Sequence, residues 1–252
     1  MEFAGSHILT VSQFERADVE RLFAVADAMR PYAHRERRTR VLDGAILGSM
    51  FFEPSTRTRI SFGSAFNLLG GEVRETTGFE HSAIAKGESL CDTARVLSGY
   101  SDIIVMRHPE NGSVAEFAAA SRVPVINGGD GANEHPSQAL LDLYTIRSEL
   151  EGRDRGLDGL RIAMVGDLRY GRTVHSLSRL LSLFDSLQVS LVSPEALCMP
   201  AEVVDSLREA GHQVLETDSL ETGIADVDIV YSTRIQEERF ASREEADVYR
   251  GR

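Results

Sequence analysis

The sequence predicts an α/β protein with two doubly wound parallel-sheet domains. Short apolar runs alternate with longer amphipathic stretches along the 252 residues, which is the order expected of strands and crossover helices. The runs are apolar at consecutive positions, as in strands buried on both faces of a parallel sheet. A polar, glycine-containing stretch at 151–159 interrupts the alternation. We therefore expect one domain over residues 1–150 and a second over 151–252.

The apolar runs and the amphipathic stretches assign each element in turn. Strands are expected at 45–52, near Val73, and at 102–106, 123–126, 161–165, 188–192 and 228–232. Apolar residues at helical spacing predict helices at 11–29, 58–69, 89–98, 113–120, 136–149, 173–184 and 201–210. Pro136 and Pro200 suit the first turn of a helix. We expect the helix at 136–149 to bridge the domains, with the active site between them at the carboxyl ends of the strands.

Composition and charge exclude several classes of protein. The chain has 27 basic and 39 acidic residues, a net charge of −12, which argues against nucleic-acid and anionic-membrane partners. The longest stretch without a charged residue, 3–14, is too short and too polar to cross a bilayer. Cys91 and Cys198 have no metal-ligand spacing, so we expect two buried or partly buried free thiols in a reducing compartment, the cytoplasm.

The segment Phe-Phe-Glu-Pro-Ser-Thr-Arg-Thr-Arg at 51–59 follows an apolar run and opens a helix. Hydroxyls, a guanidinium and free amides then meet at a helix N-terminus, which favours an anion. From the residues alone, a Ser/Thr-rich helix cap with a solvated arginine remains an alternative.

Three further segments carry candidate polar groups. Arg107 follows a strand, where it can reach a bound oxygen or simply lie at the surface. His135 and Gln138 are three residues apart at a helix start, so both can face one ligand, although a lone histidine is more often structural. Glycines at 166 and 171 follow a strand, but their spacing differs from a dinucleotide fingerprint. We interpret Arg172 there as a carboxylate ligand.

These segments, with 106–109, 129–142, 165–176 and 233–239, resemble the aspartate/ornithine carbamoyltransferase family in order and over nearly the whole chain. The resemblance implies transfer of a carbamoyl group from carbamoyl phosphate to the amine of L-aspartate. The products would be N-carbamoyl-L-aspartate and phosphate, in pyrimidine biosynthesis, and no metal or other cofactor would be needed. Glu53-Pro54, Lys86 and Arg172 favour a dicarboxylate acceptor over ornithine.

The resemblance also implies a role for each candidate residue. The catalytic residues would be Arg57, Thr58, Arg107 and His135. Carbamoyl phosphate would be bound by Ser55, Thr56, Arg57, Thr58, Arg107, His135 and Gln138. L-Aspartate would be bound by Lys86, Arg172, Arg234 and Gln236. Ser82 and Lys86 would reach a neighbouring subunit's site, which implies a homotrimer with shared active sites. Whether regulatory or dihydroorotase-type chains also bind is left open.

The chain departs from the family at its C-terminal end. Family members continue into a His-Pro-Leu-Pro loop and a last helix, and that motif does not occur in these 252 residues. We therefore expect the chain alone to have little activity, to be less stable and to expose apolar surface. A truncated, non-catalytic homologue that acts as a scaffold is the alternative from another functional class.

Overall fold

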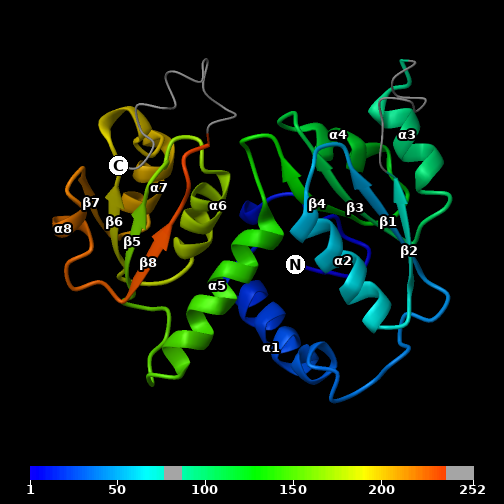
Figure 1. The fold of residues 1–252 in the computed structure, drawn as a ribbon, viewed down its shortest axis with the longest axis horizontal. Coiled ribbons are helices and arrows are strands. Elements are labelled where there is room, and N and C mark those ends of the chain that lie inside the picture. Colours follow the sequence, from blue (N-terminus) through cyan, green and yellow to red (C-terminus); the bar gives the residue numbers. More distant parts are fainter. Residues whose placement is uncertain (77–86, 237–252) are drawn as a thin grey trace. The chain divides into compact units, whose positions relative to one another are not determined.

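The computed structural model describes residues 1–76 and 87–236 and confirms the α/β class (Figure 1). The chain forms two compact units, Met1–Ser137 and Gln138–Arg252. This division lies near the start of helix α5 (Pro136–Glu151), whereas the boundary expected from composition, between residues 150 and 151, falls at the last residue of that helix. Each unit contains a four-stranded sheet in which every pair of neighbouring strands is parallel.

The first unit contains a sheet in the order β2-β1-β3-β4. Its strands are β1 (Ile46–Phe51), β2 (Glu72–Thr76), β3 (Ile103–His108) and β4 (Val125–Asp130). Its helical elements are η1 (Val11–Gln13), α1 (Arg16–Ala33), α2 (Thr56–Leu68), α3 (Leu90–Leu97) and α4 (Ser113–Ala120).

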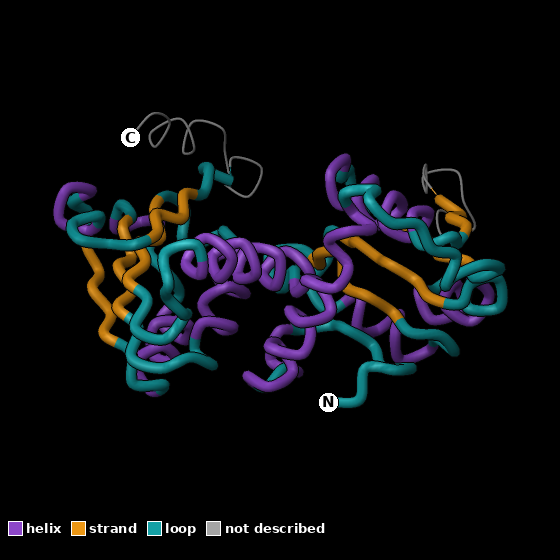
Figure 2. Tube along the Cα trace, turned by 90° about the horizontal axis from the view of Figure 1, so that it is seen from below, coloured by secondary structure: helices purple, strands orange, loops and turns teal. Residues whose placement is uncertain are grey.

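Alternate side chains of the central strands form two separate cores on the two faces of this sheet. Met50, Ile104 and Met106 pack with residues of α3 and α4, including Phe117, which is fully buried. Leu47, Phe51 and Val105 pack instead with Phe62 and Phe66 of α2. Because successive strand residues point to opposite faces, helices must cover both faces. The sheet is therefore doubly wound, and Figure 2 shows the helices that flank its strands.

The second unit contains a sheet in the order β7-β6-β5-β8. Its strands are β5 (Arg161–Val165), β6 (Gln188–Val192), β7 (Gln213–Thr217) and β8 (Ile229–Ser232). Its helical elements, after α5, are α6 (Arg172–Leu181), η4 (Glu195–Leu197), α7 (Ala201–Glu209) and α8 (Leu220–Gly223). Helices α6 and α7 pack against each other, and α8 lies against β6 and β7.

The structure corrects one expectation from the sequence and adds one strand that was not expected. The helix expected at 11–29 is wrong at its start: Thr10 caps a short 3₁₀ turn, Phe14 is extended with φ −97° and ψ 137°, and α1 begins only at Arg16. Strand β7 was not predicted. It is an edge strand whose residues are exposed or half-buried, so it lacks a continuous apolar run. Among the residues that the structure describes, no helix has both the length and the apolar character needed to cross a membrane.

Candidate functional site

The N-terminus of α2 presents free donors at the carboxyl end of β1. Ser55 is the N-cap residue, with φ −155° and ψ 102°, and its side chain makes no capping hydrogen bond. No acidic residue lies in the first turn of the helix. Thr56 and Arg57 are exposed, and within 1–76 and 87–236 no ion pair of Arg57 is seen. The free amides, the helix dipole and the guanidinium together favour a bound anion here.

Arg107 lies beside this turn because β1 and β3 are neighbouring parallel strands. Phe51 pairs with Arg107 in the sheet register, and the Phe52 amide donates to the Arg107 carbonyl at 2.9 Å. The Arg107 Nε donates to Glu53 Oε1 at 2.6 Å, and Nη1 lies 3.4 Å from the Gly128 carbonyl oxygen. Because a guanidinium has five donors in a rigid plane, these contacts set its direction and leave the other N–H groups for a ligand.

His135 is presented by the turn after β4, and Asp130 organises that turn. One Asp130 oxygen accepts from the Glu134 amide at 3.1 Å and from Asn127 Nδ2 at 3.0 Å. The other accepts from the Gly112 amide at 2.9 Å. His135 is buried, with 4% of its surface exposed, and its Nδ1 lies 3.3 Å from Ser137 Oγ. The Ser137 contact restrains the direction of the ring.

The sheet order brings these groups of the first unit to one edge. Strands β1, β3 and β4 are consecutive in the sheet and parallel, so their carboxyl ends meet at the same edge, as the arrowheads show (Figure 1). The structure thus gathers residues 55–58, Arg107 and His135 at that edge. This is the position in which open α/β sheets bind ligands.

In the second unit, a buried carboxylate joins the segment after β5 to the segment after β8. Asp167, fully buried, accepts from the Tyr170 amide at 2.9 Å and from the Gln236 amide at 3.0 Å. Gly166 has φ +119°, and a Cβ there would lie 2.2 Å from the Thr233 carbonyl oxygen. Only glycine permits this close approach. The two segments that carry Arg172 and Arg234 are therefore held together, and Gln236 Nε2 donates to the Arg234 carbonyl at 3.2 Å.

Gln138 lies at the start of α5 and donates from Nε2 to Asp142 Oδ1 at 2.8 Å. The other Asp142 oxygen accepts from the Tyr231 hydroxyl at 2.7 Å. Burial raises the pKa of Asp142, and the hydrogen bonds from Tyr231 and Gln138 oppose that shift. Burial, followed by the charge of Asp142, raises the pKa of Tyr231 above its ordinary value, so this hydroxyl keeps its proton.

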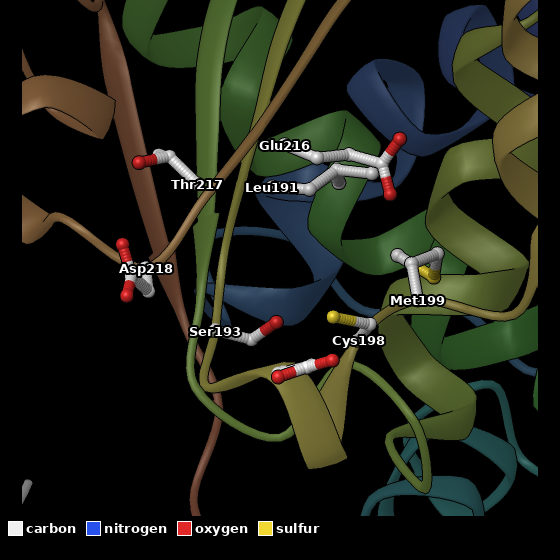
Figure 3. A pocket seen from close by; sticks show the side chains of 8 residues that line it. Leu191, Ser193, Cys198, Met199, Glu216, Thr217 and Asp218 are labelled. Carbon is white, nitrogen blue, oxygen red and sulfur yellow. The ribbon is translucent and has the colours of Figure 1, made fainter.

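A cavity of about 330 Å³ lies elsewhere, at the carboxyl ends of β6 and β7 (Figure 3). Its lining contains three carboxylates and none of the predicted site residues: Leu191, Ser193, Glu195, Cys198, Met199, Glu216, Thr217 and Asp218. Because carboxylates repel anions, this cavity does not suit a phosphate or a dicarboxylate. The expectation that Cys198 is buried or partly buried is wrong, because Cys198 is exposed. Cys91 is half-buried, as expected, and both cysteines are free.

Two of the predicted site residues, Ser82 and Lys86, lie outside the described residues. His108 and His175 each have a partner close in sequence. His108 Nδ1 accepts from the Glu110 amide at 3.1 Å, and His175 Nε2 lies 2.7 Å from the Leu168 carbonyl oxygen. Burial lowers the pKa of both rings. The described part of the chain contains no group of three or more His, Cys, Asp or Glu side chains able to hold a metal ion.

Two family models match consecutive parts of the chain. The carbamoyl-phosphate binding domain of aspartate/ornithine carbamoyltransferases matches residues 6–148, and the aspartate/ornithine binding domain matches residues 158–250. The chain belongs to the aspartate/ornithine carbamoyltransferase family.

Relatives in this family are similar over the whole chain. The aspartate carbamoyltransferase catalytic subunit of Saccharophagus degradans is 76% identical over 252 residues, which are 100% of this chain and 75% of the relative. The M. jannaschii aspartate transcarbamoylase catalytic subunit superposes with a TM-score of 0.88 at 44% identity, covering 98% of this chain and 79% of that one. A Trypanosoma cruzi aspartate transcarbamoylase in complex with carbamoyl phosphate and aspartate gives a TM-score of 0.88 at 42% identity, covering 97% and 76%.

The sequence analysis did not foresee that four acidic residues, two in each unit, hold hydrogen-bond donors in place. Glu53, Asp130, Asp142 and Asp167 each accept hydrogen bonds from groups that lie next to, or are themselves, predicted ligand-binding residues. The available signal was their position within the quoted motifs. A carboxylate close to an anion site would repel the anion, so its presence is explained by the hydrogen-bond donor that it orients.

Proposed function

We propose that the chain transfers the carbamoyl group of carbamoyl phosphate to the amine of L-aspartate. This is the reaction that a carbamoyltransferase of pyrimidine biosynthesis catalyses. The observation that carries this proposal is the Arg107 guanidinium, held by Glu53 at 2.6 Å beside a helix N-terminus that has no acidic residue in its first turn. Family membership and the aspartate-specific names of the relatives support L-aspartate over ornithine as the acceptor.

The first unit would bind carbamoyl phosphate through its phosphate group. The amides and hydroxyls of residues 55–58 and the Arg57 guanidinium would accept the dianion at the start of α2. Arg107 adds N–H donors from the neighbouring strand. In a chain of net charge −12, such a local cluster of donors is what allows an anion to bind.

The carbamoyl carbonyl would be polarised by Thr58, Arg107 and His135. As the aspartate nitrogen attacks the carbamoyl carbon, a C–N bond forms and the carbonyl oxygen takes on negative charge. The bond from carbon to the phosphate oxygen then breaks, and the departing phosphate takes the amine proton. Each donor aimed at the developing oxyanion contributes about 3–4 kcal/mol to lowering the barrier. Gln138 would hold the carbamoyl NH₂ group.

The second unit would bind L-aspartate through its two carboxylates. Arg172 opens α6 and Arg234 follows β8, and the shared contacts of Asp167 hold these two segments together. Gln236 and Lys86 would assist. Two guanidinium groups held at a set separation distinguish a dicarboxylate from the cationic side chain of ornithine.

Further assignments extend this proposal. Ser82 and Lys86 would enter the site of a neighbouring subunit, so the working form would be a homotrimer with shared sites. The free thiols of Cys91 and Cys198 are suited to a reducing compartment, and we place the protein in the cytoplasm.

The test is formation of N-carbamoyl-L-aspartate from labelled carbamoyl phosphate, with L-ornithine as the competing acceptor. Binding of N-(phosphonacetyl)-L-aspartate is measured by calorimetry on the same samples. We expect product with aspartate only, and a loss of about a hundredfold or more in Arg107→Ala. Arg95→Ala, which removes an exposed arginine of α3 paired with Asp92, is the matched control and should leave activity unchanged.

The other outcomes are equally informative. Product with ornithine alone would contradict the acceptor. Tight binding of the bisubstrate compound without any product would favour the scaffold alternative. If the chain neither bound the bisubstrate compound nor formed any product, the proposed function would be overturned altogether.

A further inference from the structure

A hydrogen-bonded chain runs from Gln138 through Asp142 to Tyr231. Gln138 and Asp142 are one turn apart on α5, and Tyr231 comes from β8. The distances are 2.8 Å from Gln138 Nε2 to Asp142 Oδ1 and 2.7 Å from the Tyr231 hydroxyl to Asp142 Oδ2. The Thr173 hydroxyl also hydrogen-bonds to the Tyr231 oxygen. All four residues belong to the second unit.

The chemistry of Asp142 decides which way the Gln138 amide faces. An ionised carboxylate only accepts hydrogen bonds, so the NH₂ end of the Gln138 amide must point to it. The amide is planar, and its carbonyl oxygen Oε1 therefore points away from Asp142. That oxygen has no donor among the described residues, so it remains an acceptor for an N–H group brought by a ligand.

Tyr231 reinforces this direction. Its oxygen already accepts from Thr173, so its own proton is directed at Asp142. Both Asp142 oxygens are then occupied by donors, one from each side. A carboxylate that is half-buried and fully engaged in this way has little freedom to turn.

We propose that Asp142 and Tyr231 are positioning residues that hold the Gln138 carbonyl oxygen toward the donor substrate, and so select an acyl phosphate whose acyl group carries an NH₂ over one whose acyl group carries a methyl group. The inference rests on the proposed function. Carbamoyl phosphate can donate an N–H to Oε1, whereas acetyl phosphate has the same shape and charge but no such donor. A site built to accept an N–H disfavours the analogue that lacks it.

The test compares the dissociation constants of carbamoyl phosphate, acetyl phosphate and inorganic phosphate, measured by calorimetry without aspartate. We expect the wild-type protein to bind carbamoyl phosphate about tenfold more tightly than acetyl phosphate. In Asp142→Asn, Tyr231 still requires an acceptor, so the new amide turns its NH₂ toward Gln138 and reverses the Gln138 amide. The preference for carbamoyl phosphate should then be lost, while affinity for inorganic phosphate stays within about twofold.

Two further variants separate positioning from simple structural support. Tyr231→Phe alone leaves the carboxylate as an acceptor, so the preference should persist. In the double variant Asp142→Asn/Tyr231→Phe nothing dictates which end of the new amide faces Gln138, so part of the lost preference should return. If the contacts only supported the fold, the double variant would bind worse than either single one. Glu149→Gln, an exposed carboxylate of the same helix, is the matched control.

The possible results distinguish a failure of the proposed function from a failure of this inference alone. Wild-type protein that binds inorganic phosphate as tightly as carbamoyl phosphate overturns the proposed function and this inference with it. A wild-type preference that survives intact in a folded Asp142→Asn variant overturns this inference alone. Loss of the preference in Asp142→Asn without any recovery in the double variant removes Tyr231 from the proposal.

Discussion

Glu53 directs the Arg107 guanidinium, and Glu53→Ala tests what that direction contributes to the reaction. The two side chains meet at 2.6 Å and are only 22% and 14% exposed, so the pair is partly shielded from solvent. Removing the carboxylate frees the guanidinium to rotate away from the start of α2. It also removes a negative charge next to a bound dianion, which by itself favours phosphate binding.

The geometry sets the expected size of the effect. A hydrogen bond to a charged group contributes about 1.5–3 kcal/mol, and partial exposure reduces this to about 1–2 kcal/mol. If the transition state needs the directed guanidinium, that loss lowers kcat/KM by about 5- to 30-fold, because 1.36 kcal/mol corresponds to a factor of ten. Affinity for inorganic phosphate should not fall, since the lost carboxylate no longer repels it.

The assay is steady-state formation of N-carbamoyl-L-aspartate, with phosphate affinity measured by calorimetry on the same protein. Glu72→Ala is the matched control, because Glu72 also contacts an arginine, Arg74, at 2.6 Å, but in a pair that is 60% and 63% exposed. A Glu53→Ala variant that keeps kcat/KM within about twofold of the wild-type value would refute the reasoning.

Two more predictions concern stability. Gly166→Ala places a Cβ 2.2 Å from the Thr233 carbonyl oxygen in a residue whose φ is +119°. We therefore expect the free energy of unfolding, measured by thermal denaturation, to fall by about 3 kcal/mol or more. Gly159→Ala, at φ +70° with nothing within 4 Å, should lose only about 1 kcal/mol, and equal losses would contradict the close-approach argument. The hydrogen bond from Arg161 is the main cause that holds the pKa of Asp228 well below its usual range. The stabilisation is therefore present above the unfolded-state pKa of about 4 and is lost as pH falls below it. Asp228→Asn should flatten the acid limb of a plot of unfolding free energy against pH, whereas the exposed Asp218→Asn should not; identical curves for both variants would refute the linkage.

The outcome of the sequence predictions depends on how local each signal was. The strands expected at 161–165 and 188–192 match β5 and β6 residue for residue, because strands covered on both faces read as continuous apolar runs. Strand β7 is an edge strand without such a run, and the extended Phe14 that separates η1 from α1 leaves no mark in the helical periodicity. The secondary-structure predictions therefore failed at an exposed strand and at a local turn, where no buried apolar pattern marks the element.

By itself, the sequence determined the fold class, the family and the donors that can meet an anion, because local hydrophobic pattern and contiguous motifs carry that information. Only the tertiary structure decided which acceptors hold those donors. Glu53 and Arg107 are 54 residues apart, and Asp142 and Tyr231 are 89 apart. The first pair forms because β1 and β3 are neighbouring strands, and the second because β8 brings Tyr231 to helix α5. Both arrangements are set by the packing of a whole unit.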